Sequence, residues 1–431
     1  MPIREILNQS NAHRELMFRA LKNVNYRRYY FAWGFSSIGT WMQAVAMGWL
    51  VYRLTHSPLL LGAVAFASQA PSIVLSPFAG VLSDRYDRRW LLFWAQACLM
   101  IQACLLAAVV LTGKVNTATL MGLGLFLGIV NAFELPIRQA FIKELIDDKN
   151  DLSNAIALNA SAMNISKLLG PALAGILIAL VGEGWCFTLN AFSFIPIVMV
   201  LLSLKLPRGQ AKPGGNGSFL GELGEGFRYA TRFSPIRALL LMLGIMSLLQ
   251  GAFQTLMPVF VKEQYHTGPE AFGLIIGAAG IGAVGAALYL AGRQSIRGLW
   301  RHIGVALPGL GFLIMAFGYV HDVRLAAGVS FLVGFVTMMQ VASTNSILQA
   351  IVEEDKRGRI MSLYGTVLIG AGPVGSVIAG ASSGTLGLPL TFLIGGSLAL
   401  VTTLIFWQSF ARLRAKVLPI YIEKGIIAVE Q

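Results

Sequence analysis

Two ionisable residues stand inside long apolar runs of this 431-residue sequence. A buried charge in such a run is costly, so each is a candidate functional residue. Glu134 lies about 7 Å inside the end of a predicted helix, at 1.5 Å per residue. Arg138 follows at i+4, so the two side chains can pair. We expect a structural or gating ion pair, with a proton carrier and a substrate contact as the alternatives.

Lys167 is the second case, near the middle of a predicted helix over residues 153–181. At helical spacing its face also carries Asn164 and Pro171. Two interpretations stay open. Lys167 either contacts a central cavity or has a structural role, bonded to neighbouring carbonyls or paired with Glu134. The two residues lie about 10 Å apart in depth, a distance that long side chains could barely bridge.

Neutral polar residues accompany these charges within the apolar runs. Polar groups in such runs normally face the protein interior. The nearby Trp33, Trp41, Phe253 and Tyr364 suit an amphipathic ligand. We therefore predict a substrate cavity, with ordinary helix packing as the alternative for most members. The candidates besides Lys167 are Gln43, Gln69, Gln250, Gln254, Gln340 and Asn345.

Enzyme chemistry finds little support in the sequence. The five histidines are scattered, and the three cysteines lie in or beside apolar runs without metal-binding spacing. Two Gly-x-Gly-x-x-Gly patterns, 280–285 and 370–375, lie inside apolar runs and follow no strand, so they are packing glycines. There is no ATP-binding loop. We expect no cofactor and no metal, and keep an integral membrane enzyme only as a poor second hypothesis.

The composition places the chain in lipid: 56% of its residues are hydrophobic and only 12% are charged. Continuous apolar runs of about 20 residues predict membrane-spanning helices, since a barrel would show short alternating segments. We predict twelve spans. They are 29–54, 58–82, 90–112, 115–138, 153–181, 184–206, 236–261, 268–292, 301–320, 324–350, 360–383 and 387–409.

The net charge of +13 is better explained by topology than by nucleic-acid binding. With the N-terminus in the cytoplasm, nearly all of the 33 Lys and Arg residues are cytoplasmic. The exceptions are Arg53, Lys114, Lys262 and Arg324 outside and Lys167 within a span. The positive-inside rule therefore places both termini in the cytoplasm. We expect no cleaved signal peptide, because residues 1–28 are polar and lack an apolar core.

The predicted spans fall into two halves. Gly170-Pro171 in the fifth span is echoed by Gly372-Pro373 in the eleventh, as expected for fused repeats. A Gly-rich segment within 207–235 forms the linker, and Phe219 to Arg232 has the pattern of an amphipathic surface helix. The predicted organisation is a cytoplasmic segment 1–28, a six-helix bundle 29–206, the linker 207–235, a second six-helix bundle 236–409 and a cytoplasmic tail 410–431.

The charged loop Gly80 to Arg89, between the second and third spans, resembles the signature loop of the major facilitator superfamily. Only Asp87 departs from the pattern, where the family prefers Gly, and Asp can adopt a left-handed turn. An anion here can accept hydrogen bonds from a helix N-terminus. The resemblance implies that Asp84 latches the start of the eleventh span in one state. The predicted cytoplasmic gate is Asp84, Arg85, Arg88, Glu134 and Arg138, with the alternative that the loop charges only set topology.

Several stretches are together similar to the enterobactin-exporter-like and macrolide-efflux-like branch of that superfamily. They include Asn25 to Arg28, Gly39 to Met42, Pro136 to Leu145 and Arg357 to Met361. The segment Leu169 to Gly175 resembles the Gly-Pro motif of its exporters, and small residues there permit close helix approach. The alternative is ordinary packing of a kinked helix at Gly170, Pro171 and Gly175.

The resemblance implies a monomeric, proton-coupled exporter of a siderophore, drug or other amphipathic metabolite in the inner membrane. Lys167 slightly favours a neutral or anionic substrate. A lipid-related transporter is the alternative.

Overall fold

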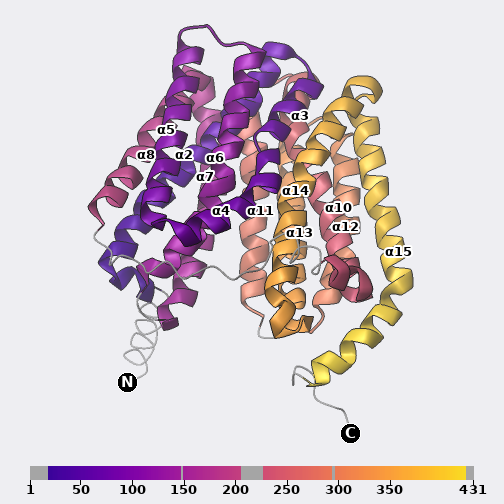
Figure 1. Cartoon of the computed structure of the whole chain (residues 1–431). Helices are drawn as coiled ribbons and strands as arrows, with labels where there is room; N and C mark the ends of the chain where they lie inside the picture. Colours follow the sequence, from indigo (N-terminus) through magenta and orange to yellow (C-terminus); the bar gives the residue numbers. More distant parts are fainter. Residues whose placement is uncertain (1–17, 147–148, 205–226, 294–296, 424–431) are drawn as a thin grey trace, which may run out of the picture.

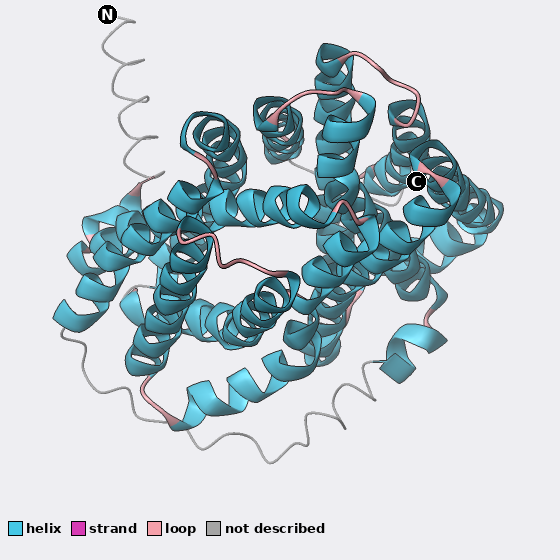
Figure 2. Cartoon of the chain, turned by 90° about the horizontal axis from the view of Figure 1, so that it is seen from above, coloured by secondary structure: helices cyan, strands magenta, loops and turns pink. Residues whose placement is uncertain are grey.

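The computed structural model describes residues 18–146, 149–204, 227–293 and 297–423. Within these ranges the regular structure is helical and no strand occurs (Figure 2). Predicted regions outside them include most of the linker 207–235. Of the predicted surface helix Phe219 to Arg232, residues 227–232 are described and are helical.

The helices form two groups that follow each other along the chain (Figure 1). After the short 3₁₀ helix η1 (Arg19–Lys22), the N-terminal group consists of α2 (Val24–Thr55), α3 (Pro58–Ala67), α4 (Ala70–Arg85), α5 (Arg88–Leu111), α6 (Thr117–Leu145), α7 (Lys149–Val181) and α8 (Glu183–Ser203). The C-terminal group consists of α10 (Ser234–Val259) with its π-helical end η2 (Phe260–Gln264), α11 (Pro269–Ala291), α12 (Leu299–Phe317), α13 (Val323–Ile351), α14 (Glu354–Leu386) and α15 (Leu388–Glu423).

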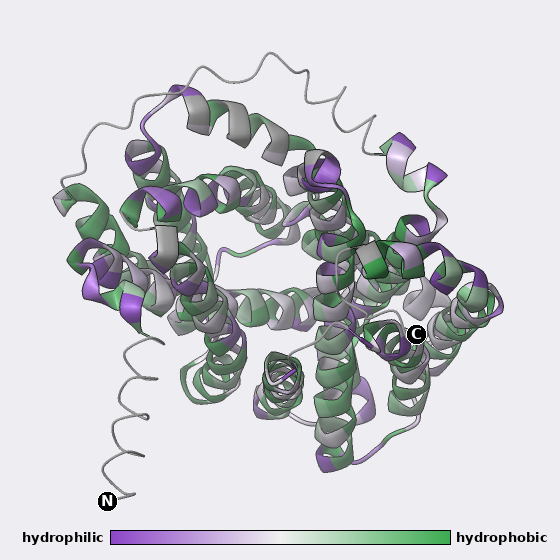
Figure 3. Ribbon diagram, turned by 90° about the horizontal axis from the view of Figure 1, so that it is seen from below, coloured by the Kyte–Doolittle hydropathy of each residue, from purple (hydrophilic) through white to green (hydrophobic). Residues whose placement is uncertain are grey.

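Eleven helices in the described part of the chain are long and apolar enough to cross a membrane. Hydrophobic residues dominate the helices in Figure 3, and hydrophilic ones concentrate near helix ends. The 32-residue α2 is not among the eleven. Its apolar run is diluted by polar residues such as Ser36, Thr40 and Gln43.

Side-chain caps explain where many of these helices begin. Asn116 accepts a hydrogen bond from the backbone of Thr119, and Asp322 accepts from Arg324 and Leu325. Asp87 likewise accepts from the backbone N–H groups of Arg89 and Trp90. Such caps satisfy donors that the first helical turn leaves free.

Several predicted boundaries differ from the structure. The predicted fourth span ended at residue 138, but α6 continues to Leu145, so Glu134 lies deeper in its helix than expected. The predicted second span 58–82 is split at Ser68 and Gln69 into α3 and α4. Pro71 lacks an N–H and crowds the preceding turn, so a continuous helix is broken there. The predicted last span ended at residue 409, but α15 continues to Glu423. Its added turns bury Leu413, Val417 and Tyr421 at i, i+4 and i+8 against the protein.

Two helices join the groups in a matched way: α7 packs on α2 and α11, and α14 packs on α10 and α3. Glycines permit the closest approaches. A Cβ at Gly170 would lie 2.6 Å from the Cβ of Trp41, and one at Gly175 would lie 2.9 Å from the Cα of Gly273. In α14, the oxygen of Gly372 lies where Gly251 would place a Cβ. The predicted packing residues Gly170, Gly175 and Gly372 thus sit at helix crossings, next to the in-helix prolines Pro171 and Pro373.

The contacts between the groups gather toward one side of the molecule. This side holds the end of α2 and the start of α11, opposite the side where α2 begins and α15 ends (Figure 1). Here the hydroxyl of Tyr52 donates to Glu263, and Trp49 stacks on Phe272 with ring centroids 5.9 Å apart. We call this side the closed side.

A valine at Gly175 should force the closed side apart, because its side chain would occupy space held by the Gly273 backbone. Spin labels at the exposed Leu180 and Leu274 should then report a longer α7–α11 distance. Gly122→Val is the matched control, since a Cβ at Gly122 meets nothing within 4 Å. An unchanged label distance in Gly175→Val would contradict the role of this crossing.

Candidate functional site

A cavity of 570 Å³ lies within the N-terminal group and against α14. Its wall combines aromatic rings, small hydroxyl groups and charged side chains. The lining residues are Trp33, Ser36, Ser37, Thr40, Trp41, Ser72, Ile73, Ser76, Gln96, Leu99, Asn131, Glu134, Leu135, Pro136, Arg138, Gln139, Met163, Phe194, Ser362, Gly365, Thr366 and Ile369. Helices α2, α4 and α6 supply more than half of them.

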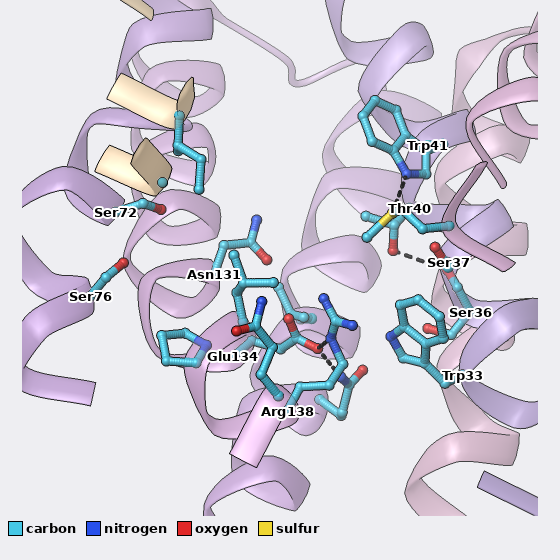
Figure 4. A pocket seen from close by; sticks show the side chains of 18 of the residues that line it. Trp33, Ser36, Ser37, Thr40, Trp41, Ser72, Ser76, Asn131, Glu134 and Arg138 are labelled. Carbon is cyan, nitrogen blue, oxygen red and sulfur yellow. Dashed lines mark hydrogen bonds and ion pairs between the residues drawn. The ribbon is translucent and has the colours of Figure 1, made fainter. Parts of the chain in front are cut away.

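One wall of the cavity is a single face of α2. Trp33 and Trp41 lie about two turns apart on it, with Ser36, Ser37 and Thr40 between them (Figure 4). Side chains at i, i+3, i+4, i+7 and i+8 share one face of a helix. The Trp41 indole N–H is directed to the sulfur of Met163, 3.4 Å away. The wall therefore offers two fixed aromatic surfaces joined by a hydroxyl strip.

The facing wall on α6 carries the ion pair (Figure 4). Arg138 Nε donates to Glu134 Oε1 at 2.9 Å, and Gln96 Nε2 donates to the same oxygen at 3.2 Å. Both charged side chains are about nine-tenths buried. The Arg138 guanidinium also lies 4.5 Å from the centroid of the Trp33 ring, a cation–π contact between α6 and α2. The predicted i, i+4 pairing is confirmed.

The C-terminal group reaches the cavity through α14. Ser362, Gly365, Thr366 and Ile369 recur at helical spacing and place one face of α14 along its edge. A Cβ at Gly370 would lie 3.4 Å from Ile73 of α4, so the two groups also approach each other here. The cavity wall therefore includes residues from both groups.

The structure does not bring the predicted gate residues Glu134 and Arg88 together. Arg88 Nη1 pairs with Glu144 at 2.7 Å, and Arg88 Nε donates to the Ser83 carbonyl. Arg88 is the first residue of α5, whereas Glu134 lies well inside α6 and forms an ion pair with Arg138. Arg85 is exposed at the end of α4, and the Asp84 side chain lies outside the described residues.

Asp87 does not adopt the left-handed turn considered for it. Its φ of −60° and ψ of 114° are extended, the usual backbone of a helix cap. The Asp that replaces the family's Gly thus contributes a cap for α5.

Gln43 lies away from the cavity lining. It is buried in a chain of amides inside the N-terminal group, where Asn190 donates to Gln43 and Gln43 donates to Gln102, each at 2.8 Å. Gln69, at the break between α3 and α4, is exposed and donates to the Ala65 carbonyl. Both side chains therefore form hydrogen bonds within the protein, and neither lines the cavity.

The other predicted glutamines and Asn345 also lie outside the lining of the 570 Å³ cavity. Gln250 accepts from Thr337 at 3.0 Å, which joins α10 to α13. Gln254 is exposed, and Asn345 accepts from Gln349 on its own helix. Gln340 is fully buried, with no hydrogen-bond partner for its amide among the described residues.

Lys167 borders the cavity without lining it. Its ammonium lies 5.2 Å from the centroid of the Trp41 ring, and Met163, one turn earlier on α7, is part of the wall. The side chain is exposed and forms no ion pair with any described residue. The proposed pairing with Glu134 is thus absent from the described structure, because Glu134 pairs with Arg138.

The small polar residues were missed from sequence. Ser36, Ser37, Thr40, Ser72, Ser76 and Asn131 line the cavity. For Ser36, Ser37 and Thr40 the signal is their helical spacing between Trp33 and Trp41. Among the described residues, no group of three or more His, Cys, Asp or Glu side chains could hold a metal ion.

Comparison with known proteins identifies the family. Residues 17–417 match the family described as transmembrane secretion effector. The chain belongs to this family of the major facilitator superfamily. It is a multi-pass membrane transporter of small solutes and not an enzyme, which confirms the sequence-based resemblance.

The transporter's relatives include efflux and siderophore proteins. It is 25% identical over 401 residues to the staphyloferrin A transporter of Staphylococcus aureus, covering 90% of this chain and 97% of that protein. It is 21% identical over 395 residues to macrolide efflux protein A of Streptococcus pyogenes, covering 88% and 95%. A solved POT family transporter in complex with 5-aminolevulinic acid shares the fold, with a TM-score of 0.73 at 13% identity over 91% of this chain and 97% of that one.

Removing one member of the Glu134–Arg138 pair should destabilise the transporter more than removing both. A lone buried charge is left in each single variant, so Glu134→Ala and Arg138→Ala should each lower the free energy of unfolding by roughly 3 kcal/mol, and the double variant by less than their sum. Unfolding titrations in detergent measure this.

The control is the exposed Glu354–Arg357 pair, 3.8 Å apart, where Arg357→Gln should change stability by less than about 1 kcal/mol. Strictly additive effects of the two alanine replacements would show that the buried pair is not coupled.

Proposed function

We propose that this transporter is a secondary active exporter of a small amphipathic solute and works by alternating access. The observation that carries the proposal is the cavity between the Trp33–Trp41 wall and the buried Glu134–Arg138 pair, with α14 at its edge. Rings suit the apolar part of a solute, and the hydroxyl and amide groups suit its polar part. The relatives' efflux and siderophore functions support export.

The proposed architecture is twelve spans in two six-helix bundles of one monomer, with both termini in the cytoplasm of an inner membrane. The eleven candidate spans and the paired packing of α7 and α14 support it. In this orientation the closed side is extracellular, and the state is inward-facing. A solute would enter the cavity from the cytoplasm.

Alternating access requires the closed side to part while the cytoplasmic side closes. The glycine crossings suit the first change, because closely packed backbones can separate once the Tyr52–Glu263 and Trp49–Phe272 contacts are released. We assign the second change to the gate residues Asp84, Arg85, Arg88, Glu134 and Arg138. In the outward-facing state Asp84 would accept hydrogen bonds at the start of α14, which begins at Glu354.

Protons are the proposed coupling ion. Glu134 is the one acidic residue among the described residues that line the cavity. Burial favours a protonated carboxyl group, whereas the Arg138 charge favours the ionised form. We therefore assign Glu134 first to the gate, and treat proton carriage by it as the competing hypothesis.

Export should be visible in the direction of accumulation. Everted membrane vesicles containing the protein should take up at least one amphipathic probe from a set of N-phenyl-1-naphthylamine, 1-anilinonaphthalene-8-sulfonate and ethidium when their interior is acidified. A protonophore should abolish the uptake, and vesicles without the protein serve as the control. Proton-driven accumulation by right-side-out vesicles instead would identify an importer.

Glu134→Gln should weaken transport while coupling to the proton gradient is partly retained, because the amide still accepts from Arg138 but no longer balances its charge. Proton-driven uptake and downhill exchange in liposomes separate the two roles. Loss of proton-driven uptake with intact exchange would show that Glu134 carries the proton.

A further inference from the structure

We propose that Lys167 and Trp41 form an anion subsite at one end of the cavity, so that the solute is an amphipathic anion with an apolar ring or chain and a carboxylate or sulfonate. The inference rests on the proposed function, in that the cavity binds the transported solute. It deepens that function by assigning the solute's charge and the residue that recognises it.

The position of Lys167 on α7 directs it away from lipid. Ile165, Leu169 and Ile176 are exposed apolar residues that mark one side of this helix. Lys167 follows Ile165 by two residues and so projects roughly 200° further round the helix. That direction is shared with Pro171, whose carbonyl packs against Gly273 of α11. Its exposed side chain therefore faces the space between the two groups.

The charge of Lys167 lacks an acid to balance it in the described structure. Glu134 balances Arg138 and accepts from Gln96, so the cavity's acid is already engaged. Lys167 has only the face of the Trp41 ring, a contact that offsets a small part of the cost of a charge inside a membrane. A bound anion would supply the missing charge.

The α2 wall matches such a solute in length. Trp33 and Trp41 are eight residues apart, or about 12 Å along the helix. Each ring carries a cation, Arg138 at 4.5 Å from one centroid and Lys167 at 5.2 Å from the other. Because Glu134 neutralises only the first cation, the net positive charge lies at the Trp41 end. A cationic drug would meet repulsion there, and no carboxylate of the cavity is left unpaired to receive it.

Two dyes that share one skeleton test the subsite. 1-Anilinonaphthalene-8-sulfonate is N-phenyl-1-naphthylamine with an added sulfonate, so comparing them isolates the anion. Binding is followed by fluorescence with the purified protein in nanodiscs, and empty nanodiscs give the background. Wild type should bind the sulfonate more tightly than the neutral dye.

Lys167→Gln should weaken sulfonate binding by about tenfold or more and leave the neutral dye unchanged, since a charge-assisted contact contributes at least the ~1.4 kcal/mol that a factor of ten represents. Lys167→Arg, which keeps the charge, should retain most of the preference. Trp41→Leu should weaken both dyes, and reports on the aromatic part independently of Lys167.

Equal binding of the sulfonate by wild type and Lys167→Gln, or equal loss of both dyes in Lys167→Gln, would overturn the subsite. Because this assay needs no transport, its failure is distinct from failure of the export proposal. Vesicles that export the neutral dye while nanodiscs show no sulfonate preference would keep the exporter and discard the anion subsite. Sulfonate preference without vesicle export would do the reverse.

Discussion

The buried ion pair of Glu134 and Arg138 constrains how the helices of the N-terminal group pack. Neither charge can stay in an apolar helix bundle alone, because an unpaired charge there costs several kcal/mol. The pair therefore determines how α6 must face its neighbours. Gln96 of α5 donates a hydrogen bond to the carboxylate, and the Trp33 ring of α2 packs over the guanidinium. Three helices are oriented around one interaction, and the cavity is the space left beside it.

The same requirement explains the other polar residues of the helices. Gln43, Gln102 and Asn190 hydrogen-bond to one another between α2, α5 and α8, which ties these helices together. Thr255 and Ser376 do the same between α10 and α14. Many Ser and Thr hydroxyls instead donate to carbonyls of their own helix, as Ser166 does to Ala162 and Thr403 to Ala399. Only part of the neutral polarity is presented to the cavity, mainly as small hydroxyl groups on α2 and α4.

The interface between the two groups is built differently from the interior of each. Backbone meets backbone at Gly175 and Gly273 and at Gly62 and Ser376. Close van der Waals packing of this kind holds helices together in lipid without a hydrophobic driving force. Separation of the groups at the closed side would break the Tyr52–Glu263 hydrogen bond and the Trp49–Phe272 contact, so the proposed alternating access requires both to be released.

The sequence by itself determined the membrane class, nearly all helix positions, the i, i+4 pairing of Glu134 with Arg138 and the family. Hydrophobic run length, helical spacing and the charged loop are local signals, and a lipid environment leaves few alternatives to the helix. Which polar residues face the cavity was decided only by the tertiary structure. Gln43, Gln340, Asn131 and Ser37 are all polar residues within apolar runs, so the sequence does not distinguish them. Helix rotation and the available partners place Gln43 and Gln340 in packed interiors, and Asn131 and Ser37 at the cavity. The partner of Arg88 and the contact of Lys167 with Trp41 likewise depend on residues far away in the chain, brought near by helix packing that no local pattern encodes.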